Sequence, residues 1–189
     1  MIKAFIILAA FFSGEAKEVK VSTTESTINW TGTKVVGKSH SGTLALKSGS
    51  LDISGGKLKG GSFVVDMTTL TDTDLSGEWK EKLEGHLKSD DFFGVEKFPT
   101  SELTITKVKS TGGNGYDVTG DITIKGKTES ISFPVTLNEK GNGYEASASI
   151  TVDRSKFDVR YGSGSFFDNL GDNAISDEFT LEVTLVASN

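Results

Sequence analysis

Residues 131–137, Ile-Ser-Phe-Pro-Val-Thr-Leu, place an apolar side chain at every second position. Successive side chains of a β-strand point to opposite faces of the sheet, so this alternation predicts a strand with one face buried and one face in water. Pro134 has no N–H to donate, and we therefore expect a bulge or a locally unpaired position there. The same pattern continues along the chain on both sides of this stretch.

Seven further segments alternate in the same way: 28–30, 40–46, 62–67, 103–105, 118–125, 144–152 and 179–185. With 131–137 they make eight predicted strands. Glycine-rich turns separate many of them, because glycine tolerates the positive φ that tight hairpins require; such turns lie at 55–56, 112–115, 125–127 and 141–143. Short consecutive connections favour an up-and-down order. The sequence therefore predicts an all-β fold, an eight-stranded antiparallel up-and-down barrel.

One segment departs from this pattern. Trp79, Leu83 and Leu87 recur every four positions, which is helical spacing and predicts one helix over 76–87. The helix lies in a long insertion, 68–100, between the third and fourth strands. Connections of this length are usually functional, often as a lid or pocket wall. A second stretch, 154–177, is aromatic and glycine-rich and is not expected to be a regular strand throughout.

Composition excludes several classes of function. The chain has 189 residues, the length of one domain, and a net charge of −6 from 20 Lys and Arg against 26 Asp and Glu. This mildly acidic balance gives no electrostatic basis for binding nucleic acid. There is no cysteine, so thiolate metal sites, disulfides and thiol catalysis are excluded.

The N-terminus has the pattern of a signal peptide over residues 1–16. Lys3 precedes an apolar run at 4–12, and Gly14 and Ala16 supply the small residues of a cleavage site after Ala16. The run is too short to span a bilayer. We therefore expect an exported mature domain, residues 17–189, with no integral membrane segment.

Three local motifs suggest chemistry, and each has a simpler interpretation. Residues 32–39 match a phosphate-binding loop, but the segment that follows alternates like a strand, which predicts a hairpin. Residues 72–77 match half of a calcium loop, yet Leu83 stands where a glutamate is needed and Glu84 comes one residue late, which favours a helix N-terminus with solvated carboxylates. His40 and His86 are too isolated in the sequence to predict a metal site. No cofactor or metal is expected.

An eight-stranded barrel is just wide enough inside to be filled by side chains or to hold one small ligand. Gly42, Ala146 and Ala148 are small residues at expected inward positions, and they would leave apolar volume that favours a hydrocarbon guest. The residues alone leave the filled barrel and the ligand-binding barrel both open.

Residues 86–93, His-Leu-Lys-Ser-Asp-Asp-Phe-Phe, are followed by Phe98-Pro99. This block closely resembles the YceI-like family of bacterial lipid-binding proteins. The hairpin at 120–128 and the Arg-x-x-Phe segment at 153–157 match family segments in the same order. The chain departs from the family pattern at Asp158, where the family often has glycine.

The resemblance implies an extended lipocalin-like barrel with one helical insertion that binds a polyisoprenoid or fatty-acyl lipid and is not an enzyme. It also implies a periplasmic or secreted location, and dimers are common in the family, which leaves a homodimer open. The expected lipid-binding residues are those of the inward stripe and the insertion: Trp30, Leu44, Phe63, Val65, Trp79, Leu83, Phe92, Phe93, Leu103, Ile105, Val118, Ile122, Phe133, Val135, Ile150, Phe179 and Leu181. Arg160 and Tyr161 are candidates for contacting a polar head at the rim.

Two alternatives belong to other classes of protein. His40 shares the parity of Leu44 and Leu46, so it is the candidate general base if the barrel is an enzyme with a substrate pocket. A filled, structural barrel that recognises a partner protein is the other alternative.

Overall fold

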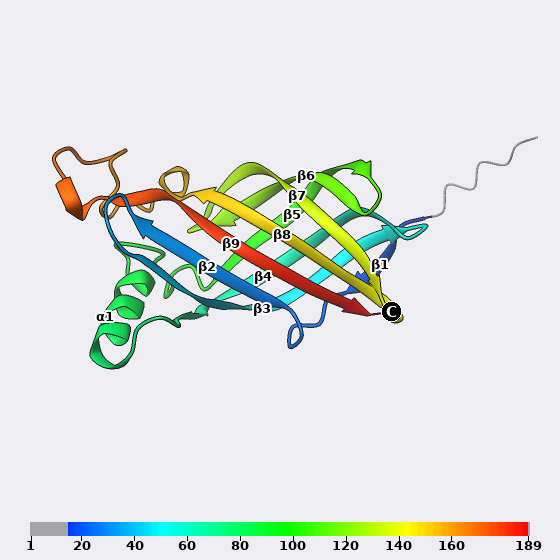
Figure 1. The fold of residues 1–189 in the computed structure, drawn as a ribbon, viewed down its shortest axis with the longest axis horizontal. Helices are drawn as coiled ribbons and strands as arrows, with labels where there is room; N and C mark the ends of the chain where they lie inside the picture. The colour runs from blue at the N-terminus through cyan, green and yellow to red at the C-terminus, as the bar shows by residue number, and fades with distance from the viewer. Residues whose placement is uncertain (1–14, 189) are drawn as a thin grey trace, which may run out of the picture.

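The structure is a computed structural model that describes residues 15–188, so most of the predicted signal peptide lies outside the described residues. Nine strands, one α-helix and two short 3₁₀ helices follow one another along the chain (Figure 1). Their bounds are β1 Lys17–Lys20, β2 Thr27–Lys34, β3 Ser39–Ser54, β4 Lys57–Asp72, α1 Gly77–Lys88, β5 Thr100–Gly112, β6 Gly115–Ile124, β7 Lys127–Lys140, β8 Gly143–Asp153, η1 Arg154–Phe157, η2 Gly171–Asn173 and β9 Ile175–Ser188. None of the helices in 15–188 is long and apolar enough to cross a membrane.

The sheet is a closed antiparallel barrel. Its strand order is β1-β3-β2-β9-β8-β7-β6-β5-β4, and β3 also pairs with β4, which closes the ring of β2 to β9. The predicted eight-stranded barrel is therefore confirmed. Each of the eight predicted segments falls on one of β2 to β9, with only Lys125 beyond its strand, and α1 lies between β4 and β5, where the helical insertion was expected.

The strand β1 was not predicted. β1 pairs with residues 50–53 of β3. It uses the same edge of β3 that pairs with β2 further along, at residues 39–44. Val21 then bridges to Ala187 of β9, so β1 continues the barrel wall beyond the start of β2. Within β1 only Val19 is buried. A single apolar residue in four shows no alternation, so the sequence pattern could not predict this strand.

Strands β3 and β4 are much longer than their patterns indicated, at 16 residues each. The insertion starts after Asp72 rather than at residue 68. The β3–β4 pairing shifts register at three places, between Thr43/Ala45, Leu46/Ser48 and Asp52/Ile53. Each bulge moves the following side chains to the other face, which is why a strict period of two ends early there.

Two local predictions have clear outcomes. Pro134 lies opposite Asp117 in a regular register, and β7 begins to pair with β8 only at the next residue, Val135. Of the two options the locally unpaired position is therefore right and the bulge is wrong. The segment 32–39 is a hairpin, since β2 ends at Lys34 and β3 begins at Ser39, with no helix to hold a phosphate.

Gly42 does not leave free volume inside the barrel. A Cβ at this position would lie 1.8 Å from the carbonyl oxygen of Thr71 and 2.7 Å from the ring of Trp30. Trp30 donates from its indole nitrogen to the same Thr71 oxygen at 3.2 Å. The expectation that Gly42 opens space for a guest is wrong, because Trp30 and the β4 backbone already occupy it.

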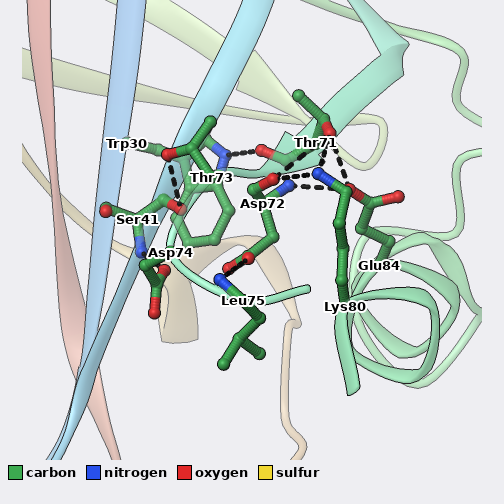
Figure 2. A network of polar contacts seen from close by, with 9 residues as sticks. All are labelled: Trp30, Ser41, Thr71, Asp72, Thr73, Asp74, Leu75, Lys80 and Glu84. Carbon is green, nitrogen blue, oxygen red and sulfur yellow. Dashed lines mark hydrogen bonds and ion pairs between the residues drawn. The ribbon is translucent and has the colours of Figure 1, made fainter. Parts of the chain in front are cut away.

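Helix α1 is held to the end of β4 by polar contacts (Figure 2). Oε1 of Glu84 accepts from the Thr71 hydroxyl at 2.6 Å and from the Asp72 N–H at 2.8 Å. Lys80 lies 3.2 Å from the same carboxylate and donates to the Asp72 carbonyl. Donation by Thr71 above all, then by Asp72 N–H and Lys80, lowers the pKa of the Glu84 carboxyl from 4.5 to about 2.

We expect Glu84→Gln to lower the free energy of unfolding by about 1–2 kcal/mol at pH 7, because charge-assisted hydrogen bonds to a partly buried carboxylate are lost. The folded-state pKa is depressed, so the charge contributes its full stability above pH 4.5 and loses it as pH falls towards 2. The difference between wild type and variant in urea unfolding should therefore shrink between about pH 4.5 and 2.

The matched control is Glu81→Gln, an exposed glutamate on the same helix. It should change stability by less than about 0.5 kcal/mol at either pH. A difference between wild type and Glu84→Gln that stays constant down to pH 2 would contradict the assigned pKa.

Candidate functional site

A cavity of about 470 Å³ lies inside the barrel. Side chains from all of β2 to β9 line it, together with the second half of α1 and the segment that follows the helix. Most of the lining is aliphatic or aromatic. The side chains therefore do not fill the barrel completely.

Most of the residues expected from the sequence line this cavity. Those that do are Trp30, Leu44, Phe63, Val65, Leu83, Phe92, Phe93, Leu103, Ile105, Ile122, Phe133, Val135, Ile150, Phe179 and Leu181. Ala146 and Ala148 line it too, in agreement with the expectation that small residues on β8 leave room.

Trp79 and Val118 do not line the cavity. Trp79 lies in the first turn of α1 with 72% of its surface exposed, whereas the helix reaches the cavity only from Leu83 onward. Lys82 lies over its ring instead, 5.2 Å from the centroid. Val118 is 1% exposed and packs in the core, with Val108 and Phe133 opposite it on the neighbouring strands.

Further apolar lining residues were missed although they share strand parity with the predicted ones. Ile28 precedes Trp30 by two positions, Leu46 follows Leu44, and Val183 and Leu185 continue the stripe of β9. The alternation that identified their neighbours would have found these residues. Leu51 and Leu58 lie beyond the bulges of the β3–β4 hairpin, where that signal is lost.

The cationic part of the lining, apart from the buried Arg154, belongs to one end of the barrel, while Ser101, Glu102 and Ser147 line the cavity from the strands. Lys34 and Lys38 from the β2–β3 hairpin and Asn173 from η2 contribute there, at the end that carries α1 (Figure 1). β1 lies towards the opposite end, where Val19 and Val21 are buried in the core. The cavity therefore has a polar mouth beside α1 and an apolar interior.

The block 86–93 builds one wall of the mouth. The His86 ring meets Tyr161 edge-on at 4.3 Å between centroids and Phe92 at 5.4 Å. Phe92 in turn contacts Phe93 at 5.7 Å. Sequence reasoning left His86 as an isolated histidine, whereas the structure gives it a packing role in an aromatic cluster.

Arg154 holds the irregular segment after β8 against this cluster. It is 3% exposed and donates to four backbone carbonyls, those of Val159, Tyr161, Ile175 and Ser176, at 2.8 to 3.0 Å. Its guanidinium lies 5.4 Å from the Phe92 ring centroid. One buried side chain thus fixes the path of the chain between η1 and β9.

Three residues of this segment bear on the expectations from the sequence. Asp158, which replaces the glycine frequent in the family pattern, adopts a left-handed conformation with φ of 61°, a region that aspartate tolerates better than most residues. Tyr161 lines the cavity, as expected for a rim residue. Arg160 does not line it; the guanidinium pairs with Asp158 at 2.5 Å and lies over Phe166.

His40 also lines the cavity, with Nδ1 placed 3.0 Å from Oδ2 of Asp74. The N–H of Ser41 above all, and then His40, hold the pKa of the Asp74 carboxyl below its usual range. Asp72 is fully buried, so the expected solvated carboxylate at this position is wrong. With His40 and Asp74 it forms the one group among residues 15–188 whose ligand atoms could hold a metal ion.

A closed antiparallel barrel with an apolar interior cavity and a polar mouth defines a class of small-ligand-binding barrels. The profile of the YceI-like domain matches residues 20–187 of this chain. The chain therefore belongs to the YceI-like domain family.

Curated relatives match over a short region. A UPF0312 protein of Pseudomonas putida strain F1 is 45% identical over 56 residues, and that of Pseudomonas fluorescens strain SBW25 shows the same identity. The matched region spans 30% of this chain and 29% of each relative.

Solved structures show the same fold over most of the chain. BcnA of Burkholderia cenocepacia superposes with a TM-score of 0.71 at 24% identity, covering 89% of this chain and 99% of BcnA. A polyisoprenoid binding domain from Saccharophagus degradans gives 0.68 at 13% identity, covering 89% and 97%. The Campylobacter jejuni YceI protein gives 0.55 at 16% identity over the full length of both chains.

Proposed function

We propose that this protein binds one long-chain apolar lipid, a polyisoprenoid or a similar fatty-acyl amphiphile, inside the barrel. The observation that carries the proposal is the largely apolar cavity of about 470 Å³ inside the barrel. An engineered apolar cavity of about 150 Å³ stays dry and binds benzene, so a cavity of this size favours a hydrocarbon over water. The polyisoprenoid-binding domain among the structural neighbours supports this ligand class.

The distribution of polar and apolar residues along the cavity supports an amphiphile. The interior takes the hydrocarbon, and Lys34, Lys38 and Tyr161 lie where a polar head would remain at the mouth. Large apolar side chains exposed within residues 15–188 belong to segments at this same end: Val35, Val36, Trp79, Tyr161, Phe166 and Phe167. They offer apolar contact to a chain entering the barrel.

The proposal includes export. The apolar run at 4–12 with small residues before the predicted cut at Ala16 supports a periplasmic or secreted protein that carries or stores the lipid. N-terminal sequencing of the protein from its native compartment would show a start at Lys17.

The direct experiment is lipid extraction from protein purified out of its native compartment, followed by mass spectrometry. We expect one prenyl or acyl lipid per chain. Delipidated protein should bind a series of prenyl alcohols with affinity that rises with chain length until the cavity is full, since each buried methylene contributes about 0.8 kcal/mol. Protein that is always empty and ignores added prenyl lipids would exclude the function.

The alternative, an enzyme with His40 as general base, has one supporting observation. His40 faces the cavity and is oriented by Asp74, as a base and its orienting carboxylate would be. His40→Gln distinguishes the two functions. If the protein is an enzyme, wild type converts the bound lipid and the variant does not. If it is a binding protein, neither wild type nor the variant changes the lipid.

A further inference from the structure

His40, Asp72 and Asp74 come together from three places in the fold. His40 lies at the start of β3, Asp72 ends β4, and Asp74 belongs to the link to α1. One ligand atom from each lies within 4.8 Å of the other two. The N–H of Thr73 donates to the carbonyl of Ser41 at 2.9 Å, which ties the link to β3 beside the group.

The Asp72 carboxylate is only half satisfied. The residue has no exposed surface, and Oδ1 accepts from the Leu75 N–H at 2.7 Å (Figure 2). Oδ2 is buried without a hydrogen-bond partner among the described residues. The nearby cation, Lys80, contacts the Asp72 carbonyl and the Glu84 carboxylate instead. A buried carboxylate oxygen with no partner is costly, so a cation or a proton shared with Asp74 would stabilise it.

The second carboxylate is also held by a backbone amide, and its other oxygen contacts His40. Oδ1 of Asp74 accepts from the Ser41 N–H at 2.7 Å, and Oδ2 lies 3.0 Å from Nδ1 of His40. In each aspartate one oxygen is held by a backbone amide while the other is left for the group. Outer hydrogen bonds of this kind orient metal ligands.

The separation of His40 and Asp74 fits the geometry of one ion. Two ligands bound at about 2.0–2.1 Å to a common zinc lie about 3–3.4 Å apart, which the His40–Asp74 separation meets. The His40 and Asp74 side chains are 30% and 35% exposed, so solvent can complete the coordination. Three protein ligands with one open position is an arrangement that zinc sites use.

We propose that His40, Asp72 and Asp74 bind a divalent first-row transition-metal ion of the zinc type. An imidazole nitrogen favours such an ion over calcium or magnesium, which prefer all-oxygen sites. Two carboxylates match its charge, and the ion supplies the partner that Oδ2 of Asp72 lacks. It also clamps the start of β3 to the entrance of α1 beside the cavity mouth.

The test is a zinc titration of tag-free, chelator-treated full-length protein by calorimetry and native mass spectrometry. We expect one Zn²⁺ per chain and a melting temperature that rises with zinc concentration. Cobalt(II) added to the same protein should give the visible spectrum of a bound, low-coordinate ion.

The decisive variant is Asp72→Asn, which keeps an acceptor for the Leu75 amide and removes the charge. Zinc affinity should fall at least about 100-fold, since a direct ligand is at least as important as the outer shell. His40→Gln should give the same loss from a partly exposed position even if Asp72→Asn folds poorly. Asp117→Asn, an exposed carboxylate on β6, is the matched control and should bind zinc like wild type.

Two outcomes would overturn the proposal. Wild-type protein that binds zinc no more tightly than His40→Gln has no site at this group. Wild-type protein that binds no zinc, together with a more stable Asp72→Asn, would mean that Asp72 and Asp74 share a proton instead. Neither outcome depends on the lipid, so this test is independent of the proposed function.

Discussion

Ala148→Trp is expected to lower the affinity for prenyl and acyl ligands at least about 100-fold while the barrel still folds. Ala148 lines the middle of the cavity, opposite Val135 on β7 and Val183 on β9, both of which also line it. An indole in this position takes the space of several methylenes of the guest. Excluding four of them costs about 3 kcal/mol, which is about 100-fold in affinity. Titration of delipidated protein with a fluorescent prenyl or acyl probe measures the change.

The control for this variant is Thr151→Trp on the same strand. Thr151 is exposed and has the opposite parity, so the indole points into solvent and the affinity should stay unchanged. Near-ultraviolet circular dichroism verifies that both variants keep their tertiary packing. Wild-type affinity in a folded Ala148→Trp protein would mean that the lipid does not occupy the barrel.

Arg154→Ala is expected to lower the free energy of unfolding by about 3–5 kcal/mol, because truncation leaves buried groups without their partner. Four carbonyl oxygens lose a charged donor, and Asp177, 3.5 Å from the guanidinium, loses its ion pair. Urea unfolding measures the loss. The segment between η1 and β9 should also become sensitive to proteolysis, since Arg154 fixes its path.

Arg160→Ala is the matched control. The Arg160 side chain is 58% exposed and pairs with Asp158 at the surface. An exposed ion pair contributes about 0–1 kcal/mol to the free energy of unfolding. A loss of less than about 1 kcal/mol in Arg154→Ala would contradict the structural role assigned to this buried arginine.

The strands could be predicted because each is a local signal. Alternation of apolar and polar residues, as in 131–137, needs no knowledge of what the strand pairs with. The missed parts depend on distant partners. Whether β1 belongs to the barrel is decided by residues 50–53 of β3, and the true end of β4 is set by bulges against β3.

The residues of the candidate site also fall into those that a local pattern predicts and those that depend on distant partners. Parity identified most of the cavity lining, but it could not show that α1 reaches the cavity only from Leu83 onward and leaves Trp79 in solvent. Gly42 was misread because its neighbours, Trp30 and Thr71, come from two other strands. The contact of His40 with Asp74 spans 34 residues of sequence and depends on the β3–β4 pairing together with the path of the link after β4.

The pairing of β3 with β4 has a consequence for how a ligand moves. Because β3 pairs with β4, the ring of β2 to β9 is closed, and a long guest that enters at the mouth beside α1 lies lengthwise between the strands. The guest then enters and leaves along its own length, and each additional isoprene unit lengthens the part of the chain that must pass the mouth. On the proposed function, the residence time of the lipid is expected to grow with chain length, because each buried methylene contributes about 0.8 kcal/mol.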